Sequence, residues 1–187
     1  MTATTGSDQA SILAKENSPG SFFAKFRGDG AQLPTAPRAK AVLLAWIGGF
    51  LAITALAGLS DITSRVLLLG SFGASCILVF GYPDGPFSQP RNVIVGHCIS
   101  SFIGLTFLAV FGAHWWAVGL AEGTAIAAMM LTRTVHPPAG SNPVIVFISK
   151  PAWIFLLYPT LFGAVILVFI ALIYNNATRE NRYPKYW

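Results

Sequence analysis

The stretch RTVHPPAGSNPVIVF, residues 133–147, places an arginine and a histidine just before two prolines and a glycine. Pro137 and Pro138 cannot donate backbone hydrogen bonds, and they push the residues before them towards extended geometry, so a helix is expected to end here. A new short helix then starts, and the free N–H groups at its start carry a partial positive charge that favours anions. The residues expected to bind an anion at this point are His136, Ala139, Gly140 and Ser141.

A second stretch repeats this pattern earlier in the chain. GASCILVF at 73–80 lines up with GSNPVIVF at 140–147, which extends the anion-binding prediction to Gly73, Ala74 and Ser75. Paired broken segments in two halves of a membrane protein indicate a transport site. The alternative is that the breaks only shape packing, because runs of small residues also serve close helix contact.

Three ionisable side chains complete the candidate path. Arg91 and Arg133 are expected to raise the anion concentration on the cytoplasmic side, although Arg133 could equally be an interfacial anchor. Glu122 is an acid well inside an apolar run, which suggests a proton carrier or a buried structural pair. His136 donates to an anion in either protonation state, or it caps a backbone carbonyl instead.

Enzyme and metal chemistry find little support in the motifs. His97 and His114 are isolated, and no histidine spacing typical of zinc occurs, so neither a metal nor a cofactor is predicted. An enzyme using His136 with Glu122 or Arg133 would need a nucleophile or a cofactor motif, and the sequence shows neither. The chain is therefore not expected to be an enzyme.

The elements that must position these residues are membrane helices. The chain has 187 residues, 54% hydrophobic and 10% charged, and residues 41–60, 92–121 and 151–178 carry no charged side chain. A helix needs about twenty apolar residues to cross a bilayer, so the sequence predicts an all-α integral membrane protein. The net charge of +5 gathers near the two ends of the chain, which fits cytoplasmic flanks and not a nucleic-acid surface.

The segments suggest two similar repeats, each with a helix, a broken or half helix, and a second helix. Six crossings, with the halves inverted, agree better with the distribution of Lys and Arg than four crossings do. Both termini are then cytoplasmic, in the inner membrane of the cell. The expected parts are a flexible N-terminal tail 1–40, spanning helices at 41–60, 92–112, 115–134 and 152–175, broken segments at 65–90 and 136–151, repeats at about 41–112 and 115–175 within a domain 41–175, and a basic tail 176–187.

The chain resembles the HPP family of integral membrane proteins, named for the motif found here as His136-Pro137-Pro138. The resemblance extends to residues 71–81, 83–97, 129–140 and 182–187. It implies a four-span membrane protein, whereas the charge distribution favours six crossings. It also implies transport of a small monovalent anion, because members in cyanobacteria and chloroplast envelopes are linked to nitrite. Asn142-Pro143 and Glu122 depart from the family pattern, so the substrate could differ.

These observations predict a small-anion transporter or channel, with nitrite as the first choice, the lipid bilayer as its surroundings and a homo-oligomer as its assembly. An accessory subunit that packs against a transporter is the main alternative.

Overall fold

The computed structural model describes residues 22–187, in two compact units, Met1–Ala36 and Pro37–Trp187. In the first unit, the described part consists of a 3-10 helix at Phe22–Arg27 followed by irregular chain. Most of the predicted N-terminal tail, 1–40, lies outside the described residues. Within residues 37–187 the second unit contains helices and no strands, which confirms the all-α prediction.

Four long helical segments match the predicted spans within a few residues. Three are long and apolar enough to cross a membrane, and the fourth, α5, is apolar but shorter. α4 begins at Pro90, where the missing N–H of proline costs nothing, and α7 is preceded by 3-10 and π turns with a kink at Tyr158. Their bounds are α2 Ala39–Thr63, α4 Pro90–Phe111, α5 Trp115–Leu131 and α7 Phe162–Thr178, with the turns before α7 at Trp153–Leu156 and Leu157–Leu161.

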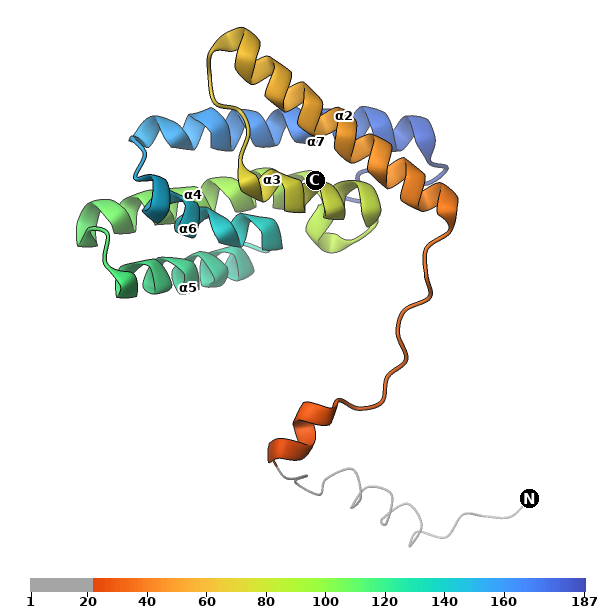
Figure 1. Ribbon diagram of the computed structural model, residues 1–187, viewed down its shortest axis with the longest axis horizontal. Coiled ribbons are helices and arrows are strands. Elements are labelled where there is room, and N and C mark those ends of the chain that lie inside the picture. The colour runs from red at the N-terminus through yellow and green to blue at the C-terminus, as the bar shows by residue number, and fades with distance from the viewer. Residues whose placement is uncertain (1–21) are drawn as a thin grey trace, which may run out of the picture. The chain divides into compact units, whose positions relative to one another are not determined.

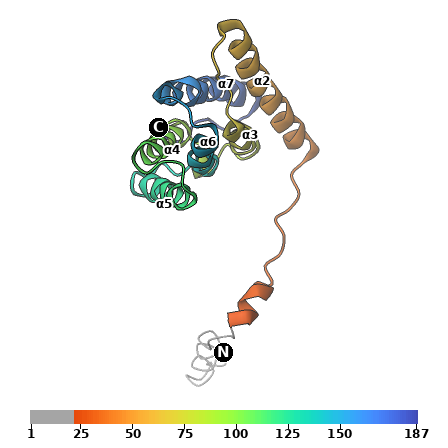
Figure 2. The same cartoon turned by 60° about the vertical axis from the view of Figure 1, so that its left-hand side comes forward.

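Two short helices occupy the predicted breaks, and extended chain precedes each of them (Figures 1 and 2). The first begins at Gly70, directly after the extended Leu69. This is three residues before the predicted start at Gly73. The second begins at Pro137, directly after the extended His136. The first half helix is α3, Gly70–Cys76, with a π turn at Ile77–Gly81; the second is a 3-10 turn at Pro137–Ser141 with α6, Asn142–Ser149.

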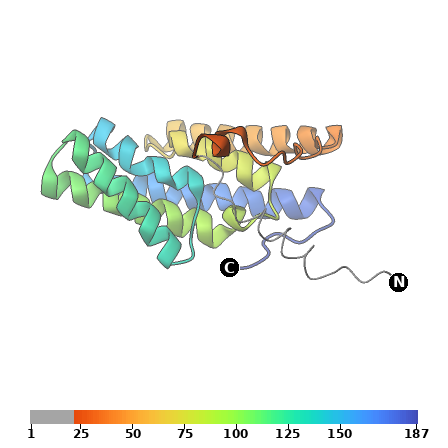
Figure 3. The same cartoon turned by 90° about the horizontal axis from the view of Figure 1, so that it is seen from below.

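Successive segments run in alternating directions, and α2 crosses the others obliquely (Figures 1 and 3). Side-chain bonds join their ends: Tyr174, late in α7, donates to the Leu44 carbonyl early in α2, and Arg91, at the start of α4, donates to the Thr132 carbonyl after α5. The six-crossing topology stays a prediction, because only three described helices are long and apolar enough to span a membrane. Structural equivalence of the two halves stays a prediction.

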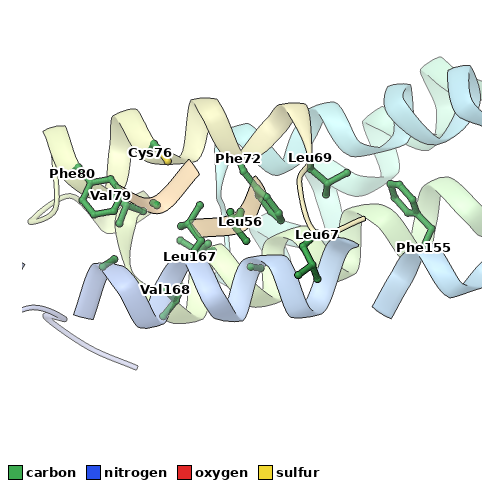
Figure 4. Packing of buried hydrophobic residues seen from close by; sticks show 14 of the residues in the cluster. Leu56, Leu67, Leu69, Phe72, Cys76, Val79, Phe80, Phe155, Leu167 and Val168 are labelled. Carbon is green, nitrogen blue, oxygen red and sulfur yellow. The ribbon is translucent and has the colours of Figure 1, made fainter. Parts of the chain in front are cut away.

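An apolar core joins α2, the first half helix and α7. Phe72, Leu56 and Leu167 are fully buried in it, and Figure 4 shows them side by side. The outer surface is also apolar, and Ile62 and Leu131 are more than four-fifths exposed. A soluble protein rarely exposes so many large apolar side chains, whereas a bilayer solvates them.

Close backbone contacts fix both half helices against the long helices. A Cβ at Gly104 of α4 would lie 2.9 Å from the Cα of Pro143, in the second half helix. At Gly163 of α7 it would lie 2.4 Å from the Phe72 ring and 2.5 Å from the Leu67 carbonyl oxygen. Glycine is therefore required at both contacts, as is typical of small residues between membrane helices.

The C-terminal tail is bound to the loop that precedes α4. Asp84 of this loop pairs with Arg179 and Lys185. The Tyr183 hydroxyl donates to the Ser88 carbonyl at 2.7 Å, and the Lys185 amide donates to Gln89 Oε1 at 2.7 Å. Arg179, Tyr183 and Lys185 thus bind the basic tail to the 82–89 loop.

We expect Gly163→Ala to destabilise the protein by about 1–3 kcal/mol, because the added methyl overlaps the Phe72 ring and a backbone carbonyl. Thermal unfolding in detergent measures the effect. Gly119→Ala in α5 is the matched control, since no described atom lies within 4 Å of its Cβ position. Equal unfolding temperatures for the two variants would contradict the close contact.

We expect Asp84→Asn to loosen the tail, which limited proteolysis with carboxypeptidase would detect as faster trimming. Partial burial raises the pKa of Asp84, but hydrogen bonds and charges from Arg179 and Lys185 outweigh it and hold that pKa below its ordinary value. The ion pairs therefore stabilise the native tail fully above about pH 4, and this stabilisation is lost as the pH falls further. Because Asp84 is 46% exposed, the effect is below about 1 kcal/mol.

The matched control for the tail is Asp61→Asn, which removes an exposed carboxylate from the end of α2. Equal trimming of both variants at neutral pH would show that Asp84 does not hold the tail.

Candidate functional site

Ser75 lies between two histidines in the centre of the second unit. Its Oγ is 2.8 Å from His136 Nε2 and 3.0 Å from His97 Nε2. All three side chains are fully buried. They come from the first half helix, from α4 and from the residue that precedes the second half helix, so this contact joins both predicted breaks to a long helix.

The partners of the rings fix where the protons lie. His136 Nδ1 is 2.7 Å from the Phe87 carbonyl oxygen, which can only accept, so His136 carries its proton on Nδ1. Its Nε2 is then an acceptor for the Ser75 hydroxyl at 2.8 Å, and the Ser71 carbonyl at 3.1 Å is a second acceptor for the same single proton. His97 Nδ1 faces the Asn142 amide nitrogen at 3.1 Å and accepts from it. The proton of His97 is therefore on Nε2 and is donated to Ser75 Oγ.

The polar chain continues from His97 towards the kink before α7. The Asn142 amide also donates to Ser101 Oγ at 2.8 Å, and Ser101 Oγ is 3.0 Å from Thr160 Oγ1. Asn142 Oδ1 is buried and has no hydrogen-bond partner among the described residues. The other atoms that link His136, Ser75, His97, Ser101 and Thr160 in this described network are paired.

Neighbouring contacts hold the break before the second half helix in place. Ser100 Oγ donates to the Ala139 carbonyl at 2.6 Å, and the Asn92 amide donates to the Val135 carbonyl at 2.9 Å. A Cβ at Gly96 would lie 3.0 Å from His136 Cβ. The extended backbone thus has the internal partners that irregular chain at membrane depth requires.

An open groove runs between the two half helices, and Ser75 is not among the residues that line it. Its walls are mainly apolar, and the Ser71 hydroxyl is buried there without a partner in the described part of the chain. Ser71 is on the same helical face as Ser75, whose Oγ lies 3.1 Å from the Ser71 carbonyl. The groove residues are Gly70, Ser71, Ala74, Ile77, Leu78, Pro137, Pro138, Ser141 and Ile145.

Glu122 of α5 reaches the second half helix. A Cβ at Gly140 would lie 3.1 Å from Glu122 Oε1, while Oε2 is buried with no partner within residues 22–187. The carboxyl group does not pair with Arg65 or with a histidine in the described structure, so no buried salt bridge accounts for it.

The two predicted cations lie outside the cluster. Arg91 is exposed and donates to the Thr132 carbonyl at 3.0 Å, and Arg133 is exposed with a left-handed φ of 57°. Both lie near the end of α5 and do not contact the cluster. They could therefore act on an anion only through their electrostatic field.

The structure brings some of the predicted binding residues together and leaves others apart. Ser75 and His136 meet directly, Ala139 is buried beside them, and Ala74 and Ser141 line the groove. Gly73 is exposed and is not among the groove residues. The structure places Gly73, Ala74 and Ser75 inside α3, one turn after its start, so their amides are not the first of that helix.

Sequence reasoning missed His97, Asn142, Ser101 and Thr160. The signal for two of them was present: His97 and Ser101 are four residues apart and share one face of α4. Within the described residues, no group of three histidine, cysteine or acidic side chains gathers as a metal site would require.

Comparison with known proteins identifies the family to which the chain belongs, and the names of its relatives state no activity. The family described as "HPP, transmembrane region" matches residues 34–184. Two proteins of Dictyostelium discoideum, each named only as a transmembrane protein, are 32% and 34% identical to the chain. Each match covers 89% of this chain, but only 57% and 63% of the respective relatives. No solved structure matches it. The chain belongs to the HPP transmembrane family.

Proposed function

We propose that this protein carries a small monovalent anion, nitrite as the first choice, across the membrane through the groove between its two half helices. The observation that carries the proposal is Ser71, a groove residue at the start of the first half helix, whose hydroxyl lies buried beneath the groove surface and has no partner among the described residues. A buried polar group without a partner is unfavourable, so a ligand that accepts from Ser71 would stabilise the site.

The surroundings of the groove favour an anion. Gly70 and Pro137 begin the two half helices, and both line it. The positive ends of two helix dipoles therefore lie near the same space. No cationic side chain lines the groove, so a monovalent anion could leave again, as transport requires. The HPP resemblance implies nitrite, which fits this size and charge.

The orientation follows from the cations. Arg91, Arg133, the start of α2 and the basic tail are at one end of the helices, which the positive-inside rule assigns to the cytoplasm. On this proposal the chain is a transporter and not an enzyme, it sits in the inner membrane, and it forms homo-oligomers because one copy is small for a complete path.

An accessory subunit is the second candidate, supported by the large apolar side chains exposed on the outer surface. One experiment distinguishes the two functions. A transporter reconstituted alone gives anion flux, and an accessory subunit does not.

We expect Ser71→Ala to raise the KM for nitrite uptake into proteoliposomes by about tenfold or more, because a hydrogen bond to a charged group contributes about 1.5–3 kcal/mol. Since Ser71 Oγ has no partner among the described residues, its removal should leave the fold intact. Thr124→Ala is the control, because that hydroxyl bonds only its own helix at the Leu120 carbonyl on an exposed face. An unchanged KM for Ser71→Ala would exclude the groove as the binding site.

We expect Arg91→Gln with Arg133→Gln to slow nitrite entry into the groove from the cytoplasmic side by about tenfold at low ionic strength, because the two cations raise the local anion concentration there. The difference should vanish near 1 M salt, where screening shortens the reach of a charge to about 3 Å. Arg65→Gln with Lys150→Gln, at the opposite end of the helices, is the matched control for flux in that direction. A loss that persists at high salt would assign Arg91 and Arg133 a structural role instead.

A further inference from the structure

We propose that His97, Ser75 and His136 form a proton relay that couples one proton to each anion carried. This inference rests on the proposed transport function and adds a coupling ion to it. Its basis is the geometry of the two imidazole rings, which share one hydroxyl between their Nε2 atoms at 2.8 and 3.0 Å.

In the neutral state the hydrogen bonds run in one direction. The Ser75 proton has two acceptors, His136 Nε2 at 2.8 Å and the Ser71 carbonyl at 3.1 Å, and the shorter contact directs it to His136. His97 Nε2–H then donates to Ser75 Oγ, Ser75 Oγ–H to His136 Nε2, and His136 Nδ1–H to the Phe87 carbonyl. Every nitrogen of both rings has a partner, and no ring has to move for a proton to pass along the chain.

A proton that arrives at His97 Nδ1 can cross this chain in two transfers. His97 Nε2 gives its proton to Ser75 Oγ as Ser75 gives its own proton to His136 Nε2. His97 is left neutral with its proton on Nδ1, and His136 becomes an imidazolium. The Phe87 carbonyl is not basic enough to take this proton, so the pair stores it while the anion is bound and gives it back through the same two transfers in reverse. The protonated pair holds one proton more than the neutral pair, and both N–H groups of His136 still have acceptors.

Asn142 supplies the second observation. After the transfer His97 Nδ1 is a donor and needs an acceptor, where the neutral state needs a donor. The unpartnered Asn142 Oδ1 meets this need if the amide turns over, and Ser101 can then donate to the same oxygen. The turn exchanges these bonds for the longer bond from the amide nitrogen to the His97 carbonyl, at 3.3 Å, which is lost. Thr160 and Ser101 can each be donor or acceptor, so the remaining bond reverses without loss.

The relay adjoins the groove, which links proton and anion. Ser75 Oγ lies 3.1 Å from the Ser71 carbonyl, and Ser71 lines the groove. An isolated charge among apolar groups is costly, and two opposite charges close together cost less. Binding of the anion therefore favours protonation of the pair, and the reverse holds by linkage.

Other titratable groups surround the pair and must be considered in any pH profile. Glu122 is the acid nearest to the second half helix. On the helices that supply the pair, on α5, on the loop 82–89, on the residues between α5 and the second half helix and on the turns before α7, the titratable and charged groups are Cys76, Tyr82, Asp84, Arg91, Cys98, Glu122, Arg133 and Tyr158. The tail adds Arg179, Tyr183 and Lys185 at the 82–89 loop.

The test follows anion and proton together in proteoliposomes that hold a pH-sensitive dye. Nitrate and nitrite are each added outside, with potassium and valinomycin clamping the membrane potential, and protein-free vesicles give the background leak. For the native protein we expect internal acidification at about one proton per anion. In Ser75→Ala and His97→Gln we expect coupled uptake to fall at least tenfold, while His114→Gln, outside the cluster, keeps native uptake.

The outcomes separate the two proposals. Native anion flux without acidification would overturn the relay and leave anion transport standing. Unchanged proton coupling in Ser75→Ala would equally overturn the relay. No flux of any anion, in protein with native thermal unfolding, would overturn both. The unfolding temperature of each variant is measured, so that loss of coupling can be separated from loss of fold. Ser75→Cys serves as the reference for this measurement, because it keeps a small polar group at position 75.

Discussion

The structure depends on the need to satisfy irregular backbone and buried polar groups where water is absent. Each break removes hydrogen bonds that a continuous helix would make, and in a bilayer each loss costs several kcal/mol. Here α4 provides the replacements: its Asn92, His97, Ser100 and Ser101 all reach the second half helix or the residues before it. Ser75 then joins that assembly to the first half helix. A single polar face of one helix thus makes both breaks possible.

The C-terminal tail extends this dependence to the surface. Tyr186 donates to the Pro86 carbonyl and Tyr183 to the Ser88 carbonyl, so the residues on both sides of Phe87 are fixed by the tail. The Phe87 carbonyl in turn sets the tautomer of His136. The position of the buried His136 imidazole is therefore influenced by the C-terminal tail, which acts through the 86–88 loop about one hundred residues before it in sequence. Loosening the tail would disturb the hydrogen bond of His136 without touching the ring.

Sequence alone predicted the elements better than their contacts. Charge-free runs and Pro137-Pro138 indicated the long helices and the second break, because hydrophobic length and proline geometry are local properties. The first half helix was placed three residues late, since Gly70 and Gly73 are equivalent as local signals and only packing against Gly163 of α7 selects the start. Ser75 and His136 were identified by analogy between two segments, yet their direct contact was not expected.

The residues that were missed share a physical cause. His97 and Asn142 have no distinctive neighbours in sequence, and their roles exist only because α4 packs against α6. Asn142 was noted as a departure from the family pattern, whereas in the structure it bonds the ring, the backbone and a hydroxyl of α4. The polar tail gave no hint of docking, because pairs such as Asp84 with Lys185 depend on the return of the chain to the same end of the helices.

The absence of fixed charge in the described cluster is itself informative. A lysine or arginine at Ser75 would bind an anion tightly, but it would need a permanent partner when the site is empty and would slow release. Hydroxyls, amides and imidazoles bond to one another instead, and among the atoms of this described network Asn142 Oδ1 is left without a partner. Glu122 lies against Gly140 at the edge of this region, so a carboxyl group borders the cluster without bonding to it.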